Sequence, residues 1–169
     1  MLYLRTRFLG SRIFTEVPMS CIRHLLTIHQ TDWSVYSALT TVEGLSRWWT
    51  PRINGDPGEG GTLRFYFDNY YKEMQVVKVE PPKMLEWRCT EGVPEWIDTV
   101  ITFEVIKRSE DACQLLFNHD KWPPFTRLFY QCNYDWAMFL RSLKKYVETG
   151  NGHPYPNQHA WDVSETFVS

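Results

Sequence analysis

The residues best suited to chemistry are His119 and Asp120, which stand side by side at the end of a stretch that alternates apolar and polar side chains. Such alternation is typical of a β-strand. In an apolar pocket, a histidine beside a carboxylate can act as a general base or orient a polar group of a ligand. A strand-end histidine hydrogen-bonded to a loop is the more common alternative, and no nucleophile stands beside His119. We therefore assign no catalytic residue and keep His119 as the one candidate to test.

Other reaction chemistries have no motif in this sequence. The chain has no GxSxG elbow and no HExxH, and the glycine cluster from Gly55 to Gly61 lacks the Lys-Ser/Thr pair of a phosphate-binding loop. Its five histidines and four cysteines lack the spacing of metal ligands. We expect no metal site and no cofactor. Scattered cysteines without a secretory signal predict reduced thiols and a cytoplasmic location.

Aromatic side chains make up 16% of the chain, which suits either a thick core or an aromatic-lined cavity. Trp48 and Trp49 are neighbours, and adjacent residues of a helix point about 100° apart. The preferred interpretation is that both are structural and fix the helical pair to the sheet; the alternative is that one packs in the core and the other rims a cavity. Trp87 stands between Glu86 and Arg88, and alternation along a strand places these charges outside if Trp87 faces inward.

A long helix is the clearest element that could position these side chains. Apolar residues recur at spacings of three and four from Phe125 to Thr149, which predicts one broad apolar stripe. Pro123 and Pro124 precede the stripe, and Gly150 follows it, where a glycine can adopt the left-handed conformation that closes a helix. Such a helix must lie on a large apolar surface.

The rest of the chain predicts a strand, two short helices and an antiparallel meander. The first strand is expected from Cys21 to Gln30. Thr31 or Asp32 can cap a first short helix, and Thr41 can cap a second one. After a glycine-rich loop at 54–61, the stretches expected to form strands are 63–67, 71–79, 84–89, 97–106 and 112–119.

The two ends of the chain lack such periods and are expected to lie outside the domain, which we place at 19–150. Residues 1–18 predict a loosely held extension, with Met19 as the functional start. Residues 151–169 contain two prolines and an Asn-Gly pair, which predict an extended tail. Trp161 and Phe167 could dock this tail onto the body or onto a second subunit.

Charge and hydropathy exclude two classes of partner. Eighteen basic and twenty acidic residues give a net charge of −2, and no basic run is present. Nucleic acid and anionic membrane are therefore poor partners. No apolar run approaches the roughly 20 residues that a transmembrane helix needs.

Several stretches in order resemble one family. They are VYSALTTVEGLSRWWTP (Val35–Pro51), GGTLRF (Gly60–Phe65), VVKVEPPKMLEW (Val76–Trp87), TVITFEV (Thr99–Val105), LLFNHDKW (Leu115–Trp122) and WAMFLRSLKKYVETG (Trp136–Gly150). Together they resemble the AHSA1-like branch, named for the activator of Hsp90 ATPase, of the START-like or SRPBCC superfamily. That superfamily also contains polyketide cyclases and Bet v 1-like proteins. The resemblance implies an α+β helix-grip fold, in which a curved antiparallel sheet wraps on a long C-terminal helix with two short helices after the first strand.

The resemblance also implies an apolar cavity between the long helix and the sheet. The family usually has a glycine before the tryptophan of the last helix, where this chain has Asp135, and this puts the usual local packing in doubt. The residues expected to contact a ligand are Trp49, Phe65, Phe67, Met74, Trp87, Trp136, Phe139 and Leu140.

Three functions stay open on this basis. The first is non-enzymatic binding of a small hydrophobic or amphipathic molecule, such as a lipid, by a monomer or homodimer. The second is an enzyme of the polyketide cyclase or dehydratase kind, which would use His119 or a cavity carboxylate as acid or base. The third is a module that binds a chaperone. The first is preferred because no catalytic group is needed for it.

Overall fold

A computed structural model describes residues 19–160 of the chain. Seven strands form one antiparallel sheet in the order β1-β7-β6-β5-β4-β3-β2. The strands are β1 (Ser20–Ile28), β2 (Ile53–Gly55), β3 (Thr62–Phe67), β4 (Tyr70–Glu80), β5 (Met84–Glu91), β6 (Val100–Lys107) and β7 (Cys113–Trp122). The helices are α1 (Asp32–Thr40), α2 (Val42–Trp48), the short 3-10 helix η1 (Pro94–Trp96) and α3 (Arg127–Thr149).

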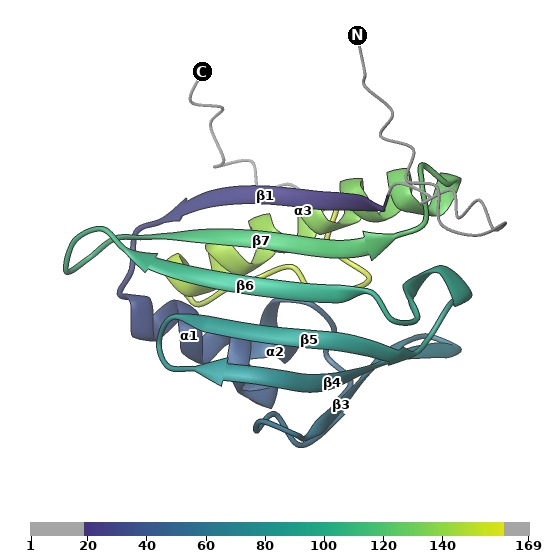
Figure 1. The fold of residues 1–169 in the computed structure, drawn as a ribbon. Helices are drawn as coiled ribbons and strands as arrows, with labels where there is room; N and C mark the ends of the chain where they lie inside the picture. The colour runs from purple at the N-terminus through teal and green to yellow at the C-terminus, as the bar shows by residue number, and fades with distance from the viewer. Residues whose placement is uncertain (1–18, 161–169) are drawn as a thin grey trace, which may run out of the picture.

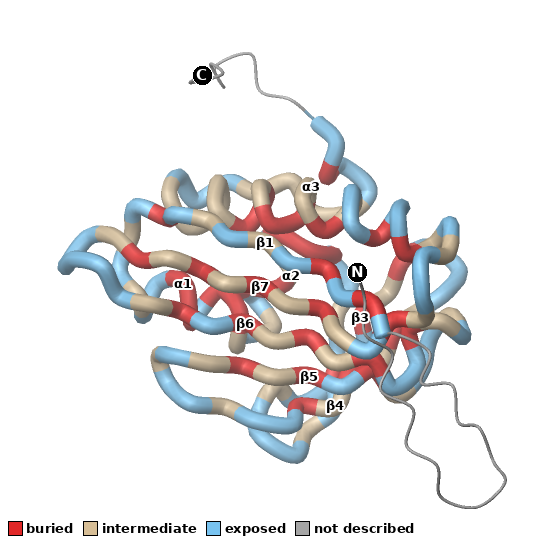
Figure 2. The backbone as a smooth tube through the Cα atoms, turned by 45° about the horizontal axis from the view of Figure 1, so that its top comes forward, coloured by how far each residue is buried: buried red, intermediate tan, exposed pale blue. Residues whose placement is uncertain are grey.

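The sheet and the three α-helices form two layers, with α1, α2 and α3 on one face of the curved sheet (Figure 1). Buried residues alternate along the strands and line the side of α3 that faces the sheet (Figure 2). This is the predicted α+β helix-grip fold. Trp87 is buried in the core and Arg88 beside it is exposed, as alternation predicts.

The long helix begins two residues later than the apolar stripe predicts. Phe125 is 66% exposed and has a φ of 43°, outside the helical region. Thr126 is the N-cap, because its side chain accepts a hydrogen bond from the Phe129 amide at 3.1 Å. At the other end Gly150 closes the helix with a φ of 80°, as predicted.

Three predicted boundaries among the strands are wrong, two of them because of a contact far along the chain. The first two residues of the predicted loop 54–61 belong to β2, which pairs with β3 from Ile53 opposite Phe65 to Gly55 opposite Leu63. The predicted strand 97–106 begins only at Val100, since η1 precedes it and Ile97 is 46% exposed. Strand β7 runs three residues past His119, because Ser20 of β1 pairs with Trp122.

Residues 151–160, which we call the C-terminal strap, return across the body and do not extend away from it. The Tyr155 amide donates to the Trp49 carbonyl at 2.8 Å, and its hydroxyl donates to Asp68 at 2.5 Å. The His153 amide donates to Ser142 Oγ at 2.7 Å. The strap is therefore held to α2, to α3 and to the β3–β4 turn. The docking predicted for Trp161 and Phe167 lies outside the described residues.

Gly152 allows the strap to lie this close, and Gly152→Ala should loosen it. A Cβ at this position would stand 2.2 Å from the Arg47 carbonyl oxygen, so the backbone must shift. We expect a loss of about 1–3 kcal/mol in the free energy of unfolding and faster proteolysis within 151–160, measured by urea denaturation and mass spectrometry of the cleavage products. Asn157→Ala, at an exposed position of the strap, is the control. Equal behaviour of the two variants would show that the close approach does not hold the strap.

Among residues 19–160, no helix is long and apolar enough to cross a membrane.

Candidate functional site

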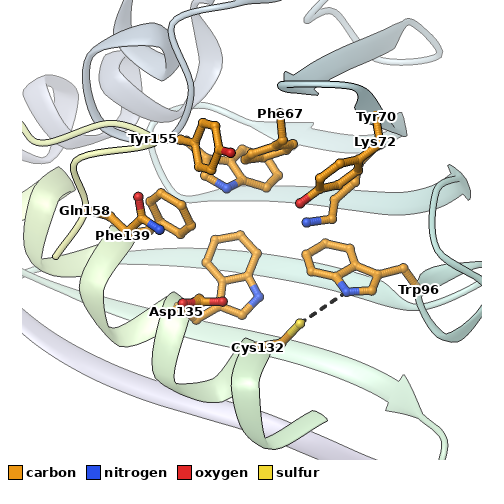
Figure 3. Close-up of a pocket in the computed structure, with 11 residues that line it drawn as sticks. Phe67, Tyr70, Lys72, Trp96, Cys132, Asp135, Phe139, Tyr155 and Gln158 are labelled. Carbon is orange, nitrogen blue, oxygen red and sulfur yellow. Dashed lines mark hydrogen bonds between the residues drawn. The ribbon is translucent and has the colours of Figure 1, made fainter. Parts of the chain in front are cut away.

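A pocket of about 70 Å³ lies where α3, the β3–β4 hairpin, η1 and the C-terminal strap meet (Figure 3). Most of its walls are aromatic, and two charged side chains project into it. The lining residues are Trp49, Phe67, Tyr70, Lys72, Trp96, Cys132, Asp135, Trp136, Phe139, Tyr155 and Gln158. The site is thus an aromatic slot that also contains one basic and one acidic side chain.

Lys72 is the unusual residue of this pocket. It faces inward from β4 together with Met74 and is only 9% exposed. Its ammonium nitrogen lies 4.0 Å from the centroid of the Trp96 ring, 4.5 Å from that of Phe67 and 5.6 Å from that of Tyr70. Figure 3 shows the amine between these three rings. The rings offer their negative faces to the cation.

No acidic side chain among residues 19–160 forms an ion pair with Lys72. Burial therefore lowers the pKa of its ammonium from 10.5 to about 8, and the more distant Cys132, Cys89 and Asp135 oppose this shift. A buried amine without a counter-ion is costly, so its presence in a pocket indicates a function.

Helix α3 supplies the opposite wall. Cys132, Asp135, Trp136 and Phe139 stand at spacings of three and four, so they share one face of the helix. Asp135, at the position where the resemblance implies a glycine, is half-buried. It accepts a hydrogen bond from Gln131 at 3.2 Å and lies 3.6 Å from His159 Nε2 of the strap. The carboxylate thus connects the pocket wall to the strap.

His119 does not line the pocket. It is completely buried, and its Nδ1 accepts a hydrogen bond from Trp136 Nε1 at 3.0 Å because an indole nitrogen can only donate. Its Nε2 must then carry the proton and donate to Thr99 Oγ1 at 2.8 Å. Burial, and after it the charge of Lys72, lowers its pKa well below 6.5. With both nitrogens occupied, neutral His119 holds the core together and has no free site for acid–base work.

Four of the eight residues predicted to contact a ligand line this pocket: Trp49, Phe67, Trp136 and Phe139. The other four are buried but lie outside its lining. They are Phe65, Met74, Trp87 and Leu140. Phe65 and Trp87 pack behind Trp49, with ring centroids 4.2 Å and 5.8 Å from it. They support the wall and do not form its surface.

The adjacent tryptophans make different contacts. Trp48 is fully buried and its Nε1 donates to the Ala38 carbonyl at 3.0 Å, so it joins α2 to α1. Trp49 lines the pocket and stacks on Trp48, with ring centroids 6.0 Å apart.

Several residues that line the pocket are not among those predicted from the sequence to contact a ligand. Lys72 could have been found, because it lies two residues before Met74 on the same predicted strand and so faces the same way. Cys132 could have been found from the helical stripe. Tyr155 and Gln158 carry no periodic signal, since the strap reaches the pocket through contacts far along the chain.

Two further features of the described residues bear on the kind of site. No three His, Cys, Asp or Glu side chains converge among residues 19–160 as metal ligands would.

A larger hollow, of about 330 Å³, lies between α2 and the start of the strap. Its lining includes the exposed Glu43 and Arg47 and has no aromatic side chain, so it is a surface depression and not a second binding slot.

Comparisons with known proteins agree with this architecture. The family model described as "Activator of Hsp90 ATPase homolog 1-like protein" matches residues 33–148. The solution structure of the Aha1 dimer from Colwellia psychrerythraea is 33% identical, with a TM-score of 0.73, over 79% of this chain and 99% of that one. No curated protein sequence matches.

Two more distant structures share the fold. The protein EF2215 of unknown function from Enterococcus faecalis is 20% identical, with a TM-score of 0.67, over 79% of this chain and 74% of that one. The crystal structure of CalU16 from Micromonospora echinospora is 18% identical, with a TM-score of 0.61, over 79% of this chain and 87% of that one. The family model matches more than half of this chain, and the alignment with the 33% identical Aha1 structure covers 99% of the Aha1 chain. This protein therefore belongs to the AHSA1 family of the SRPBCC superfamily.

Proposed function

We propose that this protein binds a small amphipathic molecule in the pocket under α3. The polar group of the ligand lies at Lys72, and its apolar part lies against the aromatic walls. The observation that supports this most strongly is the ammonium group of Lys72, which is buried in the pocket without an acidic partner among residues 19–160. A ligand that carries an oxygen acceptor would give this cation the partner it lacks.

The size of the pocket limits the ligand. A volume of about 70 Å³ is several times the roughly 10–15 Å³ that one water molecule needs, and it is well below the roughly 300 Å³ of a pocket for a drug-sized ligand. The pocket as it stands therefore takes the polar end of a ligand and a few carbons. An apolar part that buries about 100 Å² would contribute about 2.5 kcal/mol. With one charge-assisted hydrogen bond, the dissociation constant would be about 0.1–1 mM.

Non-enzymatic binding is preferred over the cyclase or dehydratase alternative. That alternative needs an ionisable group in the cavity, and Lys72 and Asp135 provide one where His119 does not. A polycyclic substrate, however, would exceed the pocket volume several-fold and would require the strap to leave. The chaperone partnership rests on the family resemblance alone, and no contact among the described residues adds to it.

Titration of the protein with three ligands of one chain length, butyrate, butanol and butylamine, tests the proposal. Butyrate should shift the NMR signals of the Trp96 and Trp136 indole N–H groups, which lie at the pocket, and leave that of Trp33, which is 59% exposed on α1. Butanol should bind more weakly, and butylamine should not bind, because it would bring a second cation next to Lys72.

Lys72→Met should weaken butyrate binding at least about tenfold, the loss of one charge-assisted hydrogen bond. Lys78→Met is the matched control, since Lys78 lies on the same strand with 46% of its side chain exposed. Shifts that appear equally at Trp33, or no shift with any of the three ligands at millimolar concentration, would refute the proposed function.

A further inference from the structure

We propose that Lys72 is a reactive amine which forms a reversible imine with the carbonyl group of a small aldehyde or ketone. This inference rests on the proposed function, because it concerns the same pocket, and it names the class of ligand. Three observations carry it: the position of the amine, the acid on the facing wall and the limited space between them.

The position of the Lys72 amine is unusual for a lysine on a β-strand. Lysine side chains at a sheet surface normally extend to water, and Lys78 on the same strand does so and pairs with Glu80 at 2.6 Å. Lys72 instead places its nitrogen between Phe67, Tyr70 and Trp96. A nitrogen fixed in this way meets any group that occupies the pocket.

The same burial makes the amine nucleophilic. With a pKa of about 8, roughly a quarter of Lys72 is neutral at pH 7.5. An ordinary lysine at 10.5 is neutral in about one molecule in a thousand at that pH. The pKa of Lys78 is raised, first by its hydrogen bond to Glu80, so it is less reactive still.

No other group in the pocket competes for the carbonyl. Burial raises the pKa of the Cys132 thiol, which also accepts a hydrogen bond from Trp96 Nε1 at 3.3 Å. Burial likewise raises the pKa of Tyr70. Both groups therefore keep their protons near pH 7, and the thiolate and phenolate that would attack a carbonyl are scarce.

The reaction needs only the amine, the carbonyl compound and a proton carrier. The nitrogen lone pair of Lys72 attacks the carbonyl carbon, a C–N bond forms, and the C=O π electrons move to oxygen. That oxygen takes up the proton lost by nitrogen, which gives a carbinolamine. The proton carrier then protonates the hydroxyl group, the C–O bond breaks and water leaves as the nitrogen lone pair forms the C=N bond, and the remaining N–H proton returns to the carrier. Nothing is oxidised or reduced.

Asp135 is placed to carry these protons. It lines the same pocket from α3, on the wall that faces Lys72. Carboxylates commonly move protons in this way. A volume of about 70 Å³ accommodates the carbonyl carbon, its oxygen and a short substituent.

The test is reductive trapping on the full chain. The protein is incubated with propanal and sodium cyanoborohydride at pH 7.5, and peptide mass spectrometry measures alkylation at every lysine. Lys72 should be alkylated at least about tenfold faster than Lys78, which reflects the difference in neutral amine. Lys72→Arg should abolish this fast event, and Lys78→Arg should leave it intact. Asp135→Asn should keep Lys72 as the alkylated site and slow its reaction about tenfold or more.

The outcomes separate the inference from the proposed function. If butyrate binds in the pocket but propanal alkylates all lysines evenly, the imine inference is refuted and ligand binding stands. If neither occurs, both fail. Fast alkylation that persists in the Lys72→Arg variant would also refute the inference, because the reactive amine would then lie elsewhere.

Discussion

Lys72→Met is expected to stabilise the protein by about 2–3 kcal/mol at pH 7. The buried ammonium costs the folded state about 3 kcal/mol, because its pKa falls from 10.5 to about 8 and each pKa unit corresponds to about 1.36 kcal/mol. The three aromatic rings around the cation offset part of this cost. Methionine keeps the length of the side chain and carries no charge, so it fills the same space without the penalty.

The gain should depend on pH with a defined sign. The folded pKa of Lys72 is depressed, so the penalty is fully present below about pH 8, where both states are protonated. Between about pH 8 and 10.5 the unfolded chain holds more protons than the folded protein, and the stability of the wild type rises with pH. The difference between wild type and Lys72→Met should therefore shrink across this window and vanish above it.

Urea denaturation at pH 7, 9 and 10.5 measures both effects. Lys78→Met is the control, because this exposed lysine should change the free energy of unfolding by no more than about 0.5 kcal/mol. A Lys72→Met variant that is less stable than wild type at pH 7 would show that the ammonium group has a strong partner in the fold. A stabilising change in a pocket is expected where a functional group is kept at a cost to stability.

Trp136→Phe is expected to destabilise the protein by about 2–5 kcal/mol, the second large effect. Phenylalanine removes the N–H that His119 Nδ1 accepts at 3.0 Å, and a buried acceptor without a partner costs about 1–3 kcal/mol. The smaller ring also leaves a cavity beside Phe117, whose ring centroid lies 4.5 Å from that of Trp136, at a further cost of about 1–2 kcal/mol.

A double-mutant cycle with His119→Leu separates these two contributions. His119→Leu alone leaves the indole N–H of Trp136 unpaired. In the double variant neither partner remains, so its loss should be smaller than the sum of the single losses by about 1–3 kcal/mol. Thr99 Oγ1 also donates to the Trp96 carbonyl at 2.6 Å, so it has a partner other than His119. Additive losses in urea denaturation would show that the Trp136–His119 hydrogen bond contributes nothing to stability.

The sequence predicts the fold well because each main element follows from a local pattern. The stripe of α3, the closing Gly150 and the caps Thr31 and Thr41 all rest on nearest neighbours along the chain. Two of the errors in the strands occur where a distant segment determines the pairing. Ile53 is in a strand only because β3 lies beside it, and β7 reaches Trp122 only because β1 does.

The candidate site is less predictable for a similar reason. Trp49 and Trp136 could be placed from the apolar pattern, but Lys72 is charged, and a charged residue is normally assigned to the solvent side. Its inward direction follows from the period of β4, against that rule. The sequence gives no pattern for Tyr155 and Gln158, because a strap without a period reveals its position only in the folded chain.

The C-terminal strap couples the size of a ligand to a conformational equilibrium. Tyr155 and Gln158 complete the pocket, and the Tyr155–Asp68 and His159–Asp135 contacts hold them there. A ligand that fits in about 70 Å³ binds the majority state at no conformational cost. A larger one binds only molecules whose strap has opened, and its apparent affinity falls in proportion to that population. By linkage, such a ligand would raise the open population, and a change that weakens the strap would favour large ligands over small ones.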